Sequence, residues 1–323
     1  MTDTNLGRPP FDPELEAALV LAGAEVPTTL TLEMIPLMRQ SVVGGENEMA
    51  DLLAARGFVS RDVTIEGHDG DAIIVSVVEK EGRTGTGPGF FHTHGGGMIV
   101  GDRWLGVEGL LGWAERFNGV IVAVEYRLAP EFPDPYPVED CYAGLRWTAD
   151  HAEELGIDLD RLLITGGSAG GGLAAGTALL ARDRRGPALV GQLLLYPMLD
   201  DRDESVSTKQ IDGVGLWDRA SNVMGWTALL GDRKGTDDVS IYAAPARATD
   251  LSGLPPAFID CGSAEVFRDE DVAYASKLWE AGVQAELHVW AGGFHAFEAF
   301  APQSAVAQAM LAARDSWVNR LLG

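Results

Sequence analysis

The chain has 323 residues, which suits one large α/β domain or two small ones. Hydrophobic residues make up 46% and charged residues 22%, as in a soluble globular protein with a sizeable core. The formal net charge of −24 repels nucleic acid and anionic membranes and argues against polyanionic substrates.

Cysteine usage and the N-terminus bear on compartment and cofactors. Cys141 and Cys261 lie far apart and fit no metal-binding spacing, so we expect two free thiols in a reducing compartment. No H-E-x-x-H pair is present, and neither a metal nor another cofactor is expected. Residues 1–13 lack the pattern of a secretory signal, and no apolar run reaches transmembrane length. These features predict a cytoplasmic protein that does not bind membranes.

Residues 1–55 lie outside the alternating pattern that follows and form a region of their own, ahead of a main domain over 56–323. Two segments in this region, 15–22 and 33–38, have the periodicity of short amphipathic helices.

From residue 60 onward, apolar segments of strand length alternate with stretches of helix length. The first two, 63–65 and 72–78, are expected to pair through a turn at Asp69-Gly70. The later segments are almost continuously apolar, as strands buried on both faces require. This alternation predicts an α/β fold with a mostly parallel sheet of about eight strands, covered by helices. The other predicted strands are 89–93, 119–124, 161–165, 192–196, 256–260 and 284–290.

Residues 199–250 interrupt this alternation. The segment begins with a charged turn and later contains Trp217, Trp226 and Tyr242. We interpret it as a cap element inserted between two strands. Two roles are open for its aromatic residues, shaping a substrate pocket or packing in the core.

The pentapeptide from Gly166 to Gly170 fits G-x-S-x-G, with Ser168 at its centre. A strand-like run precedes it and a helix-compatible, small-residue run follows, which is the context of a nucleophile on a sharp strand-to-helix turn. By itself the pattern is about as compatible with a glycine-rich turn that only packs a helix. Two further patterns favour the nucleophile.

The first is the run His94-Gly95-Gly96-Gly97, which follows a predicted strand upstream of the serine. A hydrolytic serine needs preorganised N–H donors for the oxyanion of its tetrahedral intermediate, and glycine amides supply them without blocking side chains. We expect donors from Gly95, Gly96 and Gly97, together with the N–H of Ala169. A flexible glycine loop is the alternative reading.

The second is the order in which serine, acid and histidine occur. Ser168 is followed by Glu265 and then by His295, and each lies just beyond a predicted strand. Serine, acid, histidine is the chain order of α/β-hydrolases. We therefore predict a triad of Ser168, His295 and Glu265. Asp260, at the end of a strand, is the rival acid, and Asp269 is a weaker one.

From about residue 60 to the C-terminus the chain resembles the bacterial hormone-sensitive-lipase-like esterases of the α/β-hydrolase fold. The resemblance rests on the HGGG run, on Tyr126–Glu131, on Gly166–Gly171, on Leu251–Ala257 and on Phe267–Glu270. Some further segments are similar to bacterial heroin (acetyl-ester) esterases. These are 151–158, 170–177 and 240–256.

The chain departs from the family pattern at two positions. The family usually has aspartate where Glu265 stands, and an acidic residue, threonine or glutamine where Gly167 stands. A glutamate can orient a histidine as an aspartate does. In the Tyr126–Glu131 stretch we expect Arg127 and Glu131 to pair and to hold loops near the site.

The resemblance also implies an architecture. It implies that residues 1–55 form an N-terminal helical cap over the active site, where Met34, Leu37 and Met38 are available to line an acyl pocket. Helices that only pack on the core are the alternative. An exposed last strand is able to pair with a second copy, and the resemblance favours a homodimer.

The residues and the resemblance together predict a serine carboxylesterase. The resemblance implies short to medium acyl chains, an uncharged ester as the small-molecule partner and an acyl-enzyme intermediate. A non-catalytic small-molecule receptor on the same fold is one alternative. Amidase, thioesterase or acyltransferase activity from the same residues is another, because the shape of the cap selects the leaving group and the acceptor.

Overall fold

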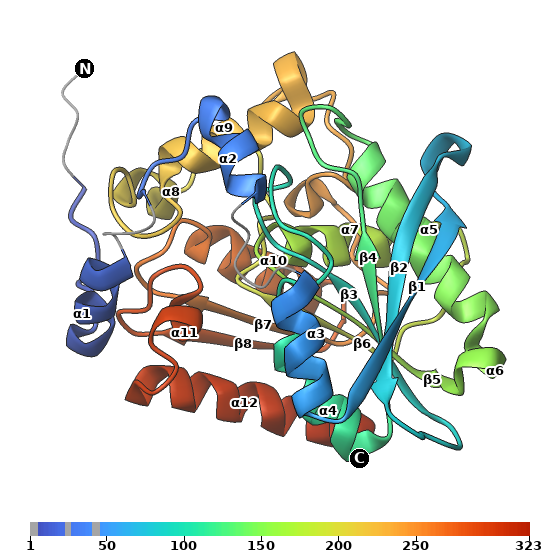
Figure 1. The fold of residues 1–323 in the computed structure, drawn as a ribbon. Coiled ribbons are helices and arrows are strands. Elements are labelled where there is room, and N and C mark those ends of the chain that lie inside the picture. Colours follow the sequence, from blue (N-terminus) through green and yellow to red (C-terminus); the bar gives the residue numbers. More distant parts are fainter. Residues whose placement is uncertain (1–5, 23–26, 41–45) are drawn as a thin grey trace.

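The computed structural model describes residues 6–22, 27–40 and 46–323. Eight strands form one sheet in the order β1-β2-β4-β3-β5-β6-β7-β8 (Figure 1). The strands are β1 (Phe58–Glu66), β2 (Ala72–Lys80), β3 (Gly87–Thr93), β4 (Val120–Glu125), β5 (Ile157–Gly167), β6 (Gly191–Leu195), β7 (Ala257–Gly262) and β8 (Ala285–Trp290). β2 runs against its two neighbours, and β3 to β8 are parallel. The predicted sheet of about eight mostly parallel strands is confirmed.

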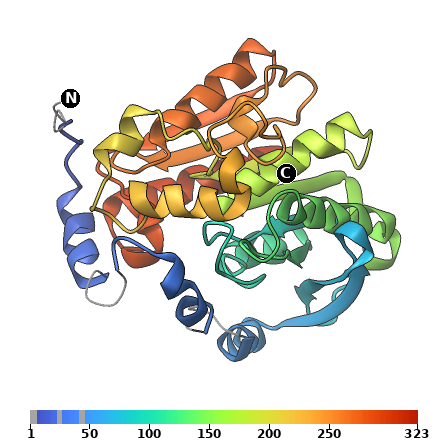
Figure 2. The same ribbon diagram turned by 90° about the horizontal axis from the view of Figure 1, so that it is seen from above.

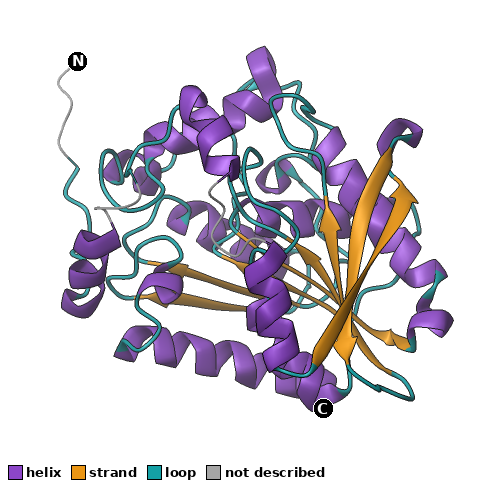
Figure 3. Ribbon diagram, in the orientation of Figure 1, coloured by secondary structure: helices purple, strands orange, loops and turns teal. Residues whose placement is uncertain are grey.

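Helices cover both faces of the sheet (Figure 3). One face packs against α5 (Tyr136–Asp150), α7 (Ala169–Asp183) and α10 (Arg268–Glu280), and the other against α3 (Glu46–Ala55), α4 (Glu108–Phe117) and α12 (Ala305–Leu322). The remaining helices are α1 (Pro13–Ala22), α2 (Ile35–Gln40), α6 (Ala152–Leu155), α8 (Val206–Gln210), α9 (Arg219–Leu230) and α11 (Phe297–Phe300), with the 3₁₀ turns η1 (Leu32–Met34), η2 (His68–Gly70), η3 (Gly231–Arg233) and η4 (Pro245–Arg247).

Neighbouring residues of the central strands feed two separate cores. Phe90 packs toward α4 and α12, whereas Phe91 packs toward α5 and α7. Leu163 and Ile164 of β5 divide in the same way. Successive side chains of a strand point to opposite faces, so a strand covered on both faces must be apolar at every position. This explains the continuous apolar runs of the sequence.

The N-terminal region lies along the side of the molecule (Figure 2). Phe11 and Leu15, at the start of α1, pack with Phe294 and Phe297 near α11. The Leu30 N–H donates to Ser221 Oγ of α9 at 2.8 Å, which ties the chain just before α2 to the 199–250 segment. Residues 1–5, 23–26 and 41–45 of the expected cap lie outside the described residues.

The third N-terminal helix, α3, packs on the sheet. Met49 and Leu53 are buried in the same core as Phe58 of β1. This helix was not predicted from the sequence. Of the residues expected to line an acyl pocket, Met34 and Met38 are half-buried against the core, whereas 66% of Leu37 is exposed.

Candidate active site

Ser168 lies in the sharp turn between β5 and α7, where the G-x-S-x-G pattern predicts a nucleophile. Its φ of 57° and ψ of −124° are rare for a residue other than glycine. The Ser168 N–H donates to Leu195 O, and its carbonyl accepts from Met198 N–H, both at 2.9 Å. A Cβ on Gly170 would lie 2.1 Å from Thr93 O, so only glycine allows the turn to approach β3 this closely.

The three residues predicted as a triad meet in the structure. His295 Nε2 lies 2.9 Å from Ser168 Oγ, and His295 Nδ1 lies 3.1 Å from Glu265 Oε1. The second carboxylate oxygen of Glu265 accepts from the Gly262 N–H at 2.6 Å. Glu265 is fully buried and His295 is 8% exposed. The serine is thus within hydrogen-bond reach of a histidine whose far side faces a buried carboxylate.

Two neighbouring parallel strands bring the acid and the histidine together. Glu265 follows β7, and His295 follows β8, the next strand in the sheet. Their loops are hydrogen-bonded to each other, since Ala264 N–H donates to Gly293 O at 3.0 Å and Gly292 N–H donates to Ser263 Oγ at 2.8 Å. The separation of thirty residues in sequence closes because the carboxyl ends of parallel strands share one edge of the sheet.

The two rival acids have other partners. Asp260 is fully buried and bonded to Arg314, with Nε 2.8 Å from Oδ2 and Nη2 3.0 Å from Oδ1. Asp269 accepts from the Ser207 N–H at 2.7 Å and pairs with Arg268. Neither carboxylate has a hydrogen bond to His295 within the described ranges.

The glycine run contacts the serine. An added Cβ on Gly95 would lie 3.5 Å from Ser168 Cβ. Gly97 has a φ of 62°, and a Cβ there would lie 2.2 Å from Cη2 of Trp217. The run is therefore packed between the nucleophile and an aromatic ring of the 199–250 segment, with no space for side chains.

His94 and Tyr126 fix the start of the glycine run by ring stacking and hydrogen bonds. Their rings are stacked 4.1 Å apart, and Tyr126 OH donates to His94 O at 2.8 Å. His94 Nδ1 donates to Gly95 O at 2.8 Å. Burial lowers the pKa of His94 to about 4, so the ring is neutral at neutral pH. His92, buried near the end of β3, also has a pKa lowered by burial to about 4, and its Nε2 donates to Leu105 O.

Two aromatic residues beside the site make contacts with the histidine that were not predicted from the sequence. Tyr196 and Phe267 both contact the His295 ring edge-on, at centroid distances of 4.9 and 5.1 Å. Tyr196 ends a predicted strand, and Phe267 lies two residues after Glu265, but neither residue type announces such a contact. Of the aromatic residues in the 199–250 segment, Trp217 lies against the glycine run, whereas Trp226 is fully buried in the core.

The expected pair of Arg127 and Glu131 is wrong. Arg127 bonds instead to Asp140, with Nη2 2.7 Å from Oδ1, and to Asp71. The Glu131 carboxylate accepts hydrogen bonds from both terminal nitrogens of Arg39, each at 3.0 Å. Since Arg39 lies on α2, the loop after β4 is linked to the N-terminal region across 92 residues of sequence.

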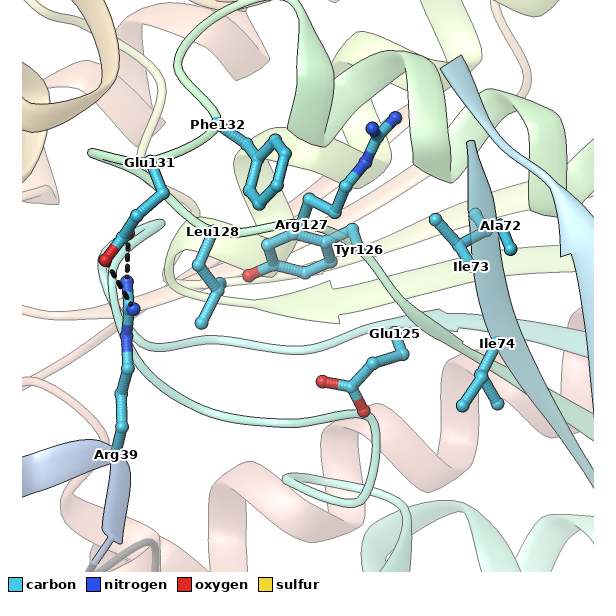
Figure 4. Close-up of a pocket in the computed structure, with 10 residues that line it drawn as sticks. All are labelled: Arg39, Ala72, Ile73, Ile74, Glu125, Tyr126, Arg127, Leu128, Glu131 and Phe132. Atoms are coloured by element: carbon cyan, nitrogen blue, oxygen red, sulfur yellow. Dashed lines mark hydrogen bonds and ion pairs between the residues drawn. The ribbon is translucent and has the colours of Figure 1, made fainter. Parts of the chain in front are cut away.

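A cavity of about 410 Å³ lies on the outer side of this loop, with the Arg39–Glu131 pair at one end (Figure 4). Ser168, Glu265 and His295 are not among its described lining residues. The lining residues are Arg39, Ala72, Ile73, Ile74, Glu125, Tyr126, Arg127, Leu128, Glu131 and Phe132. One of the lining residues, Tyr126, donates its hydroxyl hydrogen to the His94 carbonyl at 2.8 Å.

Both cysteines are buried thiols, and burial raises their pKa well above the usual value. Over the described ranges, no three His, Cys, Asp or Glu side chains are grouped to hold a metal ion. None of the described helices combines the length and the apolar character needed to cross a membrane.

The fold is similar to solved esterases over nearly its whole length. Bacterial heroin esterase superposes with a TM-score of 0.86 and 38% identity, covering 97% of this chain and 98% of that one. Esterase LipW from Mycobacterium marinum superposes with a TM-score of 0.85 and 31% identity, covering 98% of each chain.

Curated relatives are similar to this chain in sequence over a shorter stretch. Esterase LipI of Mycobacterium tuberculosis is 36% identical over 202 residues, which are 62% of this chain and 62% of LipI. Carboxylesterase NlhH of the same organism is 39% identical over 202 residues, 62% of this chain and 63% of NlhH. The matched part thus spans less than two thirds of these relatives.

A family model described as alpha/beta hydrolase fold matches residues 90–299, which include the glycine run, the serine turn and the loops of Glu265 and His295. The resemblance that the motifs carry is confirmed, and the chain belongs to this α/β-hydrolase family, in its hormone-sensitive-lipase-like group.

Proposed function

We propose that the protein is a serine carboxylesterase that hydrolyses short- to medium-chain acyl esters through an acyl-enzyme intermediate. The observation that carries this proposal is the 2.9 Å between His295 Nε2 and Ser168 Oγ. A serine hydroxyl becomes a useful nucleophile only when a base within hydrogen-bond reach takes its proton. The names of the relatives, esterase and carboxylesterase, support the same class of reaction.

Acylation begins when His295 Nε2 accepts the proton of Ser168 Oγ and the oxygen attacks the ester carbonyl carbon. The carbonyl π electrons move to oxygen and give a tetrahedral oxyanion. When the carbonyl re-forms, the bond to the alcohol oxygen breaks, and the protonated His295 gives its proton to that oxygen. The alcohol leaves, and the acyl group remains on Ser168.

Deacylation repeats these steps with water. His295 takes a proton from a water molecule, whose oxygen attacks the acyl carbon, and then returns the proton to Ser168 Oγ as the acid departs. Through both halves Glu265 accepts the Nδ1–H of His295, holds the imidazole in the tautomer that leaves Nε2 free to act as base, and stabilises the transient imidazolium.

The oxyanion is assigned to the N–H groups of Gly95, Gly96, Gly97 and Ala169. Ala169 begins α7, so its N–H has no intrahelical acceptor and lies at the positive end of a helix dipole. The contact between Gly95 and Ser168 supports donors from the glycine run. Removal of one such donor typically costs roughly 3–4 kcal/mol of transition-state stabilisation.

The proposal includes a division of the chain. Residues 1–55 act as an N-terminal cap, residues 56–323 as the catalytic domain, and 199–250 as a cap insertion within it. The bond between Leu30 and Ser221 supports a joint cap, and the packing of Trp217 on Gly97 supports a substrate site bordered by the insertion. A homodimer through the edge strand β8 remains a prediction.

The proposal is tested with p-nitrophenyl acetate, butyrate, octanoate and palmitate, using wild type and Ser168→Ala. We expect hydrolysis by wild type with a maximum among the acetate, butyrate and octanoate esters, and a loss of kcat by about 10⁶-fold in the variant. Equal rates for both proteins would rule out the serine mechanism. Anilides and acyl thioesters in the same panel distinguish a carboxylesterase from an amidase or a thioesterase.

A further inference from the structure

Tyr196 occupies the space between the serine turn and the histidine. Its ring meets the His295 ring at a centroid distance of 4.9 Å and an interplanar angle of 74°. On the other side, an added Cβ on Gly167 would lie only 3.3 Å from Tyr196 Cε2. Gly167 is one of the two positions at which this chain departs from the pattern of the family it resembles, and its missing side chain leaves room for this ring.

A buried ionic network holds the Tyr196 hydroxyl. Tyr196 OH donates to Glu298 Oε1 at 2.7 Å, and Arg314 Nη1 donates to the same oxygen at 2.9 Å. Arg314 is also bonded through two nitrogens to Asp260. The Arg314 side chain is 5% exposed, and although burial alone would lower its pKa, the carboxylates of Asp260 and Glu298 raise the pKa above its usual range.

The backbone of Tyr196 is fixed at the same place. Its N–H donates to Asp260 O at 2.6 Å, and its φ of 37° is unusual for a residue with a large side chain. Such a conformation persists only where the surroundings over-determine it, and these conformations cluster at functional sites. Ring, hydroxyl and backbone of Tyr196 are thus each held by a separate contact.

We infer that Tyr196 is a positioning residue for His295, fixed by the Asp260–Arg314–Glu298 network. The inference rests on the proposed function. During turnover His295 Nε2 takes a proton from the serine oxygen, gives it to the leaving alcohol oxygen and later takes one from water. Each transfer requires the imidazole ring to be oriented toward the oxygen concerned. The edge-on contact with Tyr196, together with that of Phe267, limits rotation of the imidazole.

The test compares Tyr196→Leu, which deletes the ring, with Tyr196→Phe, which keeps the ring and loses the bond to Glu298. Two readouts are measured, namely kcat and KM for p-nitrophenyl butyrate and the rate constant for phosphonylation of Ser168 by a fluorophosphonate. The end-point of phosphonylation counts reactive serines, so both rates are expressed per active site.

For Tyr196→Leu we expect kcat and the phosphonylation rate to fall by about tenfold to 100-fold, with KM within about twofold of wild type. For Tyr196→Phe we expect each rate to be only about two- to fivefold below that of wild type. Should the leucine variant fail to fold, Tyr196→Met removes the ring with a flexible side chain of similar reach.

Tyr274→Leu is the matched control. Tyr274 is a buried tyrosine on α10 whose hydroxyl has no partner among the described residues. We expect it to lower thermal stability and to leave both rates per active site unchanged. The inference is overturned if Tyr196→Leu keeps both rates within about twofold, or if the two leucine variants lose them by the same factor. Absence of ester turnover in wild type would contradict the proposed function alone, since phosphonylation still reports on Tyr196.

Discussion

Arg314 holds both carboxylate oxygens of Asp260, through Nε at 2.8 Å and Nη2 at 3.0 Å. This pair decides which acid faces His295. Asp260 lies within β7 and is bonded to the arginine of α12, whereas Glu265, in the loop that follows the strand, reaches the imidazole. The longer glutamate side chain spans the distance from this loop.

The first prediction concerns Glu265. Glu265→Gln should lower kcat by about 10³-fold or more with little change in KM, because an amide holds His295 in the wrong tautomer and cannot stabilise the imidazolium. Steady-state kinetics on p-nitrophenyl butyrate, normalised by active-site titration, measures this effect. A variant with a kcat near that of wild type would show that another group orients the histidine.

Asp260→Asn supplies the opposite prediction. Loss of this carboxylate leaves the buried guanidinium of Arg314 with the Glu298 carboxylate and a neutral amide, and breaking a buried ion pair typically costs about 3–5 kcal/mol of folding free energy. We expect a much lower denaturation midpoint in urea, together with a kcat per titrated site far above that of Glu265→Gln. A loss of turnover confined to the aspartate variant would reverse the assignment of the acid.

The third prediction addresses the glycine run. Gly97→Ala places a methyl group where the ring of Trp217 lies, at a backbone φ of 62° that L-residues seldom adopt. The run must shift, and its N–H groups move from the oxyanion. We expect kcat/KM to fall by about 10²- to 10³-fold.

Gly112→Ala is the control for this substitution. Gly112 lies within α4, and an added Cβ meets no atom within 4 Å. Alanine there should leave kcat unchanged and raise stability by about 0.5–1 kcal/mol. Equal activity of the two alanine variants would exclude Gly97 from the oxyanion site.

The features that sequence reasoning found are local ones. The central strands β3, β4 and β7 are runs of buried residues, and the sites after β3, β5, β7 and β8 each follow a predicted strand by a few residues. Parallel strands carry those positions to one edge, so the meeting of Ser168, Glu265 and His295 followed from chain order and strand direction.

The features it missed depend on side chains far apart in sequence. Arg127 and Glu131 are four residues apart, which suggested a pair, but the positions of α2 and α5 give them Arg39 and Asp140 instead. A local sequence pattern does not indicate which of several charged side chains will form an ion pair with a given residue. The same holds for Tyr196, whose role depends on Arg314, 118 residues later in the chain.

The fourth prediction is a pH dependence of stability that His92 and His94 confer. Burial lowers the pKa of each to about 4, below the value of about 6.5 expected in the unfolded chain. Between about pH 6.5 and 4 the unfolded state therefore binds more protons, and the free energy of unfolding falls as the pH falls, by up to about 3 kcal/mol per histidine.

His92→Gln tests this dependence, since the glutamine amide is able to donate to Leu105 O in place of Nε2. The loss of unfolding free energy between pH 7 and 5, measured in urea, should be about 1–2 kcal/mol smaller in the variant. Buried Glu270 and Asp271, whose pKa burial raises, act with the opposite sign but are common to both proteins. Parallel pH profiles would show that His92 is not neutral in the folded state.

The fifth prediction concerns the link between α2 and the loop after β4. Arg39 donates to Ile99 O and Ala129 O, both at 2.8 Å, as well as to Glu131. Arg39→Met removes these donors from their acceptors, so we expect a loss of about 1–3 kcal/mol in stability. If α2 belongs to a cap, KM should also rise several-fold, because loosening such an element changes substrate binding.

Arg61→Met is the matched control, because Arg61 and Glu154 form an exposed pair at 3.4 Å on the surface. Its removal should change stability by no more than about 0.5 kcal/mol and leave KM unaltered. Limited proteolysis adds a structural readout, since a loosened α2 is cut sooner in Arg39→Met than in wild type or Arg61→Met. Identical cleavage and identical KM in all three proteins would mean that Arg39 stabilises the fold without acting on the substrate site.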